Sequence, residues 1–94
     1  MSLKIVSYDL KSQNRDYTQL ISAIKEEGSW WHYMESFWLL DTKKSVDDLV
    51  EKLKDLLDQE DRLLIIDLSS RDYNGWLPQT AYDWISKRIK NDVV

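Results

Sequence analysis

The sequence predicts one α+β domain in which the elements follow the order β-α-β-β-α-β, with an additional C-terminal helix. Three observations support this prediction. Apolar residues recur at helical spacing in three segments, and β-favouring apolar and aromatic residues fill the stretches between them. The 94 residues also contain only 2 Gly and 1 Pro, so no linker or domain boundary is evident. We therefore expect a single domain over residues 1–94, with a core at about 3–70 and an extra helix at about 78–90.

The first strand is expected at about Leu3 to Asp9, where a run of β-favouring residues ends in a carboxylate. A helix of about Asp16 to Glu27 follows, because its apolar residues lie at positions i, i+3, i+4 and i+7. Asn14 or Asp16 can cap its amino end, and Gly28 is expected to end it in the αL conformation.

The next segment, Ser29 to Thr42, is dominated by aromatic and branched residues, which favour a sheet. Fourteen residues exceed the length of a typical strand. We expect either two strands that meet near residues 34–36 or one strand bent by a bulge.

The second half of the chain repeats the alternation. Ser45 is expected to cap a helix of about Val46 to Asp58, whose valines and leucines lie on one side and whose early acids favour the positive helix end. Leu63 to Leu68 forms the last core strand. Pro78 suits the first turn of a third helix that ends near Lys90.

This order is typical of a ferredoxin-like sheet with two helices on one face. In the last strand Leu64 and Ile66 point one way while Leu63 and Ile65 point the other, so both faces are apolar. A sheet with one face in water alternates apolar and polar residues. We expect the third helix to cover part of the second face and a two-fold partner to cover the rest, as a homodimer.

Composition excludes several classes of protein. The absence of Cys excludes disulfides and thiolate metal sites, and no apolar run is long enough to span a membrane. We expect a cytoplasmic protein without membrane association. The net charge of −4 argues against a protein that coats nucleic acid through a basic surface.

Several motifs together resemble those of CRISPR-associated protein 2. Tyr8-Asp9 ends the first strand, Arg15 precedes the first helix, Ser36-Phe37-Trp38 lies in a later strand, and Asp61 leads the last strand. The similarity covers about residues 3–70. The wider superfamily includes the virulence-associated protein D ribonucleases, and the closer similarity is to short, stand-alone bacterial proteins with a Trp-Trp-His-Tyr segment, sometimes labelled SinR-like.

The resemblance implies a ferredoxin-like homodimer. In members that act as nucleases, the residue at the position of Asp9 and its symmetry mate hold a divalent metal, Mg²⁺ or Mn²⁺, between the subunits. In CRISPR adaptation, members of the family instead serve as a structural bridge for DNA. The acidic charge of this chain departs from the basic surface that such a bridge needs.

Asp9 is therefore the candidate catalytic and metal-binding residue, although a carboxylate at a strand end is also typical of an Asx-turn. Tyr8 and Ser36 are hydroxyls able to position water or substrate. Lys11 and Arg15 are candidate phosphate-binding residues, or else solvated surface residues.

The aromatic residues admit two interpretations. They are either a core or dimer face, or a surface on which nucleic-acid bases stack. The set consists of Trp30, Trp31, Tyr33, Phe37 and Trp38. The only histidine, His32, is expected to be a structural imidazole among them rather than an acid-base catalyst. Asp67 lies in a strand expected to run antiparallel to the first, so we expect it far from Asp9.

Two functions remain open on the sequence. The first is a metal-dependent endonuclease that acts on RNA or DNA at the dimer axis through Asp9. The second is a non-catalytic dimeric module that binds a partner or ligand through an aromatic sheet face.

Overall fold

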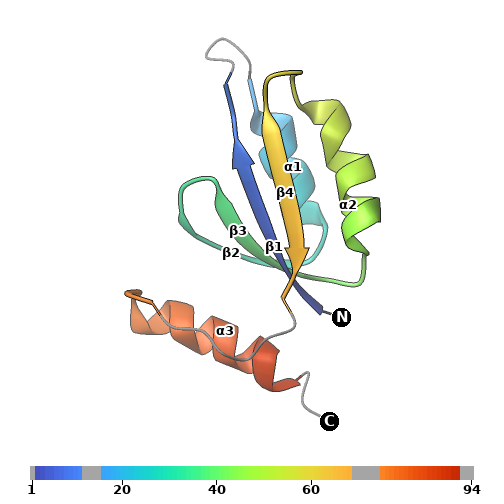
Figure 1. Ribbon diagram of the computed structural model, residues 1–94. Helices are drawn as coiled ribbons and strands as arrows, with labels where there is room; N and C mark the ends of the chain where they lie inside the picture. The colour runs from blue at the N-terminus through green and yellow to red at the C-terminus, as the bar shows by residue number, and fades with distance from the viewer. Residues whose placement is uncertain (1, 12–15, 69–74, 92–94) are drawn as a thin grey trace.

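The computed structural model describes residues 2–11, 16–68 and 75–91. Within them the strands form one four-stranded antiparallel sheet in the order β2-β3-β1-β4 (Figure 1). The elements are β1 (Ser2–Asp9), α1 (Thr18–Glu26), β2 (Ser29–Met34), β3 (Phe37–Thr42), α2 (Val46–Leu53), the 3₁₀ turn η1 (Lys54–Leu56), β4 (Arg62–Asp67) and α3 (Gln79–Asn91). This order and topology confirm the expected ferredoxin-like fold with an additional helix.

The first face of the sheet packs against α1 and α2 and holds the larger core. Trp38 and Leu40 from β3 and Val6 from β1 are buried completely there. Helix α1 contributes Leu20, Ala23 and Ile24, and α2 contributes Leu49 and Leu53. All of these helix positions except Ala23 belong to the apolar stripes that predicted the two helices.

The second face is covered at one end by α3. Ala81 and Ile85 of this helix pack on Leu3, Trp31 and Leu39, which are all buried. Helix α3 crosses near the amino end of β1, away from the end that carries Asp9 (Figure 1). The prediction that the third helix covers part of the second face is therefore confirmed.

Toward the other end of this face, apolar side chains are open to solvent. Leu64 is 60% exposed and Ile66 is 46% exposed. In register they pair with Ser7 and Ile5 of β1, so the exposed strip runs along β4 beside the carboxyl half of β1. The side chains of Leu64 and Ile66 are called the uncovered strip below.

The structure defines the path of residues 29–42 and the two ends of α2. Ser29 to Thr42 is a hairpin of two strands that turn at Glu35 and Ser36, with a register irregularity between Trp31 and Met34. Ser45 caps α2 by accepting a hydrogen bond from the backbone N–H of Asp48 at 3.1 Å, as expected. The helix ends at Leu53 rather than near Asp58, because its last turn tightens into η1.

Gly28 follows α1, but the expected αL conformation is wrong. Its φ is 159°, far from the αL value of about 57°. A Cβ at this position would lie 2.0 Å from the carbonyl oxygen of Asp41. Glycine is therefore required because β3 approaches the backbone closely here, not because of a left-handed turn.

An ion-pair cluster around Glu27 joins the end of α1 to the region around α2. The Glu27 side chain is 5% exposed, the Lys44 ammonium lies 2.7 Å from one carboxylate oxygen, and the Lys52 ammonium contacts the other. Burial raises the pKa of Glu27, but the hydrogen bonds from Lys44 and Lys52 outweigh this effect and lower the pKa. The cluster stabilises the packing of the two helices around a charge that the sequence pattern did not single out.

Candidate active site at the end of β1

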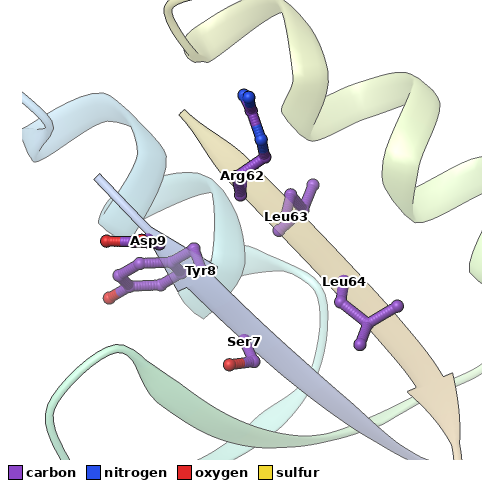
Figure 2. A pocket seen from close by; sticks show the side chains of 6 residues that line it. All are labelled: Ser7, Tyr8, Asp9, Arg62, Leu63 and Leu64. Atoms are coloured by element: carbon purple, nitrogen blue, oxygen red, sulfur yellow. The ribbon is translucent and has the colours of Figure 1, made fainter. Parts of the chain in front are cut away.

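Asp9 ends β1 and stands at the open end of the second sheet face. A surface pocket of about 190 Å³ lies there between β1 and β4 (Figure 2). Its lining consists of Ser7, Tyr8, Asp9, Arg62, Leu63 and Leu64. Ser7 pairs in register with Leu64, and Asp9 pairs with Arg62. The side chains of Ser7, Asp9 and Arg62 therefore lie on the second face, the same face as the uncovered strip.

The carboxylate of Asp9 forms an ion pair with the nearby Lys11. The ammonium of Lys11 lies 2.9 Å from an Asp9 oxygen, and the two side chains are 51% and 63% exposed. Asp9 is thus accessible to solvent and partly neutralised by a cation from its own chain. A carboxylate in this position can bind a hard metal ion if the ammonium gives way.

Asp61 fixes the backbone that carries Lys11. This residue is 7% exposed, and one of its oxygens accepts a hydrogen bond from the Lys11 backbone N–H at 2.7 Å. The Tyr17 hydroxyl donates to the Asp61 carboxylate at 2.7 Å, and the Asp58 backbone N–H does so at the same distance. One buried carboxylate therefore ties the segment after β1 to α1 and to the start of β4.

This anchoring role of Asp61 does not follow from the sequence pattern. Within the described residues, its partners include groups at 3, 44 and 50 residues' separation, which cannot be inferred from local spacing. The sequence does place Asp61 directly before an apolar strand, where an acidic side chain that becomes buried needs several hydrogen-bond donors.

Tyr8 and Ser36 lie at the same end of the sheet as Asp9 but differ in what they offer. The Tyr8 side chain is 9% exposed, and its hydroxyl accepts a hydrogen bond from the Trp38 indole at 2.9 Å within the core. Ser36 sits in the β2–β3 turn with a φ of 59°, and its carbonyl accepts from the Tyr8 backbone N–H at 3.1 Å. Tyr8 thus packs on the first face, opposite Asp9, while the side chain of Ser36 is exposed and does not line the pocket.

Of the two expected phosphate-binding residues, Lys11 lies beside Asp9, and Arg15 lies outside the described residues. Arg62 is a cation that sequence reasoning missed. It pairs in register with Asp9, is exposed, and donates to the backbone carbonyls of Gln59 and Asp61 at 3.3 and 3.0 Å. The signal was available, because antiparallel pairing places the first residue of β4 opposite the last residue of β1.

The aromatic residues divide between the two faces of the sheet. Trp31 stacks on Tyr33 and contacts the Phe37 ring edge-on, on the face that α3 covers. On the other face, Trp38 lies in the first core, and Trp30 packs against it edge-on. A single continuous aromatic face is therefore absent from this part of the structure.

His32 is a structural imidazole among these rings, as expected. It stacks on Trp38 with ring centroids 3.8 Å apart, and its Nδ1 lies 3.0 Å from the Phe37 carbonyl oxygen.

Asp67 lies at the opposite end of β4, where it pairs with Lys4 in register. Five residue steps along the strands separate this pair from the Asp9–Arg62 pair, which is about 17 Å at the rise of an antiparallel strand. The expectation that Asp67 is far from Asp9 is confirmed. Among the described residues no group of three or more His, Cys, Asp or Glu side chains is arranged to hold a metal ion.

Residues 1–75 match the family model described as CRISPR associated protein Cas2. The match includes the whole sheet, α1, α2 and the candidate site, and it ends before α3. No curated protein and no solved structure shows significant similarity to the chain. No helix in the described ranges has the length and apolar character needed to cross a membrane.

Proposed function

The chain belongs to the CRISPR associated protein Cas2 family, and from this premise we propose that it is a homodimeric, metal-dependent endonuclease. Its substrate would be RNA or DNA, and its reaction the hydrolysis of a phosphodiester bond at the dimer axis. The observation that carries the proposal is the position of Asp9, an exposed carboxylate at the end of β1 beside apolar surface that α3 leaves open.

The uncovered strip supports dimerisation at this end of the sheet. Full burial of a leucine or isoleucine side chain contributes about 1.5–3 kcal/mol, and Leu64 and Ile66 retain about half of their surface in water. A second copy packed on the strip would bury this surface. Because Asp9 shares the face with Leu64, the same contact would bring the two Asp9 carboxylates toward a common axis.

The residues fit a Mg²⁺ or Mn²⁺ ion only when two copies contribute. One chain supplies one open carboxylate, and Mg²⁺ in proteins is commonly held by one or two carboxylates together with water. When bound, such an ion would supply polarisation of a phosphoryl oxygen and a lower pKa for a coordinated water. Lys11 and Arg62 would hold the phosphate by charge, and Ser7, which lines the same pocket, would orient substrate or water.

Cleavage assays test the catalytic part of the proposal. Labelled single-stranded RNA and DNA are incubated with the full chain over a range of Mg²⁺ and Mn²⁺ concentrations. We expect metal-dependent cleavage that Asp9→Asn abolishes, because the amide cannot replace the charged ligand. Asp83→Asn, a matched change on α3, should cleave like the wild type. Equal activity of wild type and Asp9→Asn would exclude Asp9 as the catalytic ligand.

Sedimentation velocity tests the dimer independently of catalysis. We expect the wild type to dimerise and Leu64→Glu to shift it toward the monomer, because the new charge would have to be buried in the interface. Val50→Glu is the control, since Val50 is an exposed apolar residue on α2, on the other side of the sheet. A wild type that stays monomeric, or a Leu64→Glu protein that dimerises normally, would contradict the proposed interface.

One observation favours the alternative, a non-catalytic dimeric module. A cavity of about 480 Å³ lies between α3 and the second face, and its lining is almost entirely apolar, including Trp31, Phe37 and Ile85. Pockets of this size and character bind small molecules or partner side chains. The two functions differ in the assays above, because a module of this kind dimerises but cleaves neither RNA nor DNA at any metal concentration.

A further inference from the structure

We infer that Lys11 is the resident counter-cation of Asp9, and that it must release the carboxylate before a divalent metal ion can bind there. This inference rests on the proposed metal-dependent function and deepens it. It assigns Lys11 a role in setting metal affinity, in addition to any contact with a phosphate.

The contact geometry supports an exchangeable ion pair. The Lys11 ammonium lies 2.9 Å from an Asp9 oxygen, and about half of each side chain is exposed to water. Ion pairs with this exposure are weak, because water and salt screen them. A divalent ion that meets the Asp9 carboxylate can therefore displace the ammonium without a rearrangement of the fold.

The backbone of Lys11 is held more firmly than its side chain. Its N–H donates to the buried Asp61 carboxylate at 2.7 Å, which in turn accepts a hydrogen bond from the Tyr17 hydroxyl. Lys11 thus remains within reach of Asp9 whether or not its ammonium is engaged. The ammonium that leaves the carboxylate stays beside the site, where a phosphate group would need a cation.

Charge balance gives the exchange a reason. In the proposed dimer, two Asp9 carboxylates approach one another, and like charges at short distance repel. Two Lys11 ammonium groups neutralise these two charges when no metal is bound, and one divalent ion neutralises them when it is. The metal therefore replaces the two lysines as the source of positive charge, and the lysines become free to bind an anionic substrate.

The test is direct Mn²⁺ binding to the full chain, followed by the electron paramagnetic resonance signal of free Mn²⁺ at neutral pH and constant ionic strength. We expect Lys11→Gln to bind Mn²⁺ about two- to thirtyfold more tightly than the wild type, the range that corresponds to the loss of two exposed ion pairs, one from each copy of the dimer. Lys87→Gln is the matched control, because it removes the same charge from the exposed Lys87 on α3, at the other end of the sheet. It should change the affinity by less than about 1.5-fold.

The outcomes separate this inference from the proposed function. Unchanged or weaker Mn²⁺ binding in Lys11→Gln would overturn the role of Lys11, while loss of binding in Asp9→Asn would still support the metal site. If Asp9→Asn binds Mn²⁺ as the wild type does, or if no variant binds it, both the metal site and the exchange are wrong. Binding by Lys11→Gln alone would support the inference in its strongest form.

Discussion

Replacing Asp61 by Ala should cost about 3–5 kcal/mol of folding free energy. The Asp61 carboxylate accepts hydrogen bonds from the Lys11 and Asp58 backbone N–H groups and from the Tyr17 hydroxyl, all between 2.7 and 2.9 Å. A hydrogen bond to a charged group contributes about 1.5–3 kcal/mol. The substitution would leave these donors without the carboxylate acceptor. Because the donors are only partly buried, water should hydrogen-bond to them and reduce the loss of folding free energy.

Urea unfolding at 25 °C, followed by tryptophan fluorescence, measures this cost. A domain of this size is stable by roughly 5–14 kcal/mol, so Asp61→Ala should remain folded but lose a large part of its stability. Asp61→Asn keeps the shape and one acceptor, and should cost less, about 1–2 kcal/mol. The two variants together distinguish loss of acceptors from loss of packing.

The control is Asp55→Ala, which removes an exposed carboxylate from η1 a few residues away. Its effect should stay within about 0.5 kcal/mol. The anchoring role of Asp61 would be refuted if Asp61→Ala cost no more than about 1 kcal/mol beyond this control, or if Asp61→Asn were as destabilising as Asp61→Ala.

Three further predictions concern stability. Glu27→Gln should lower the unfolding free energy by about 1–3 kcal/mol at pH 7, measured by urea unfolding. The same substitution should have little effect well below the ordinary Glu pKa of 4.5, because the folded-state pKa of Glu27 is lowered and its contribution to stability is lost as pH falls through the folded-state pKa. An effect of equal size at both pH values would contradict this prediction. Gly28→Ala should cost about 2–4 kcal/mol in thermal unfolding, since its Cβ would collide with the Asp41 carbonyl, and a neutral result would show that β3 can shift. Tyr8→Phe should cost about 1–2 kcal/mol in urea by leaving the Trp38 indole N–H without its acceptor, whereas an unchanged midpoint would mean that water takes the place of the hydroxyl.

Local pattern was sufficient for the order of elements and for one end of the site. The spacing of Leu49 and Leu53 predicted α2, and the hydroxyl of Ser45 predicted its start. The apolar run that ends at Asp9 predicted β1. Antiparallel pairing of β1 and β4 predicted that Asp67 lies far from Asp9, and the register confirms it. These features depend on periodicity and on topology rules, which a single sequence contains.

Features that depend on distant residues were missed or misjudged. The Asp61 anchor joins residues up to 50 positions apart, and nothing in local spacing identifies Tyr17 as its partner. Gly28 was assigned to the wrong conformation because its constraint comes from Asp41 on another strand. Arg62 was overlooked, although the predicted strand pairing already placed it opposite Asp9.

The position of α3 changes the argument for a dimer. The sequence showed that both sheet faces are apolar, and we expected a second copy to cover what the third helix left. Helix α3 accounts for the end of the face around Leu3 and Trp31 from within the same chain. The exposed apolar surface next to Asp9 is the uncovered strip, Leu64 and Ile66, while Tyr33 and Trp76 are exposed elsewhere on the same face.

The small area of the uncovered strip has two physical consequences. Two apolar residues per copy supply less surface than an obligate dimer buries, so association through the strip should be weak and concentration-dependent. At the same time, α3 leaves the Asp9 end of the face open instead of obstructing it, so the helix that lies outside the family match does not occupy the candidate site. In the proposed dimer, the strength of association and the access of a nucleic acid to Asp9 would both depend on the same division of one sheet face, between a helix at one end and exposed side chains at the other.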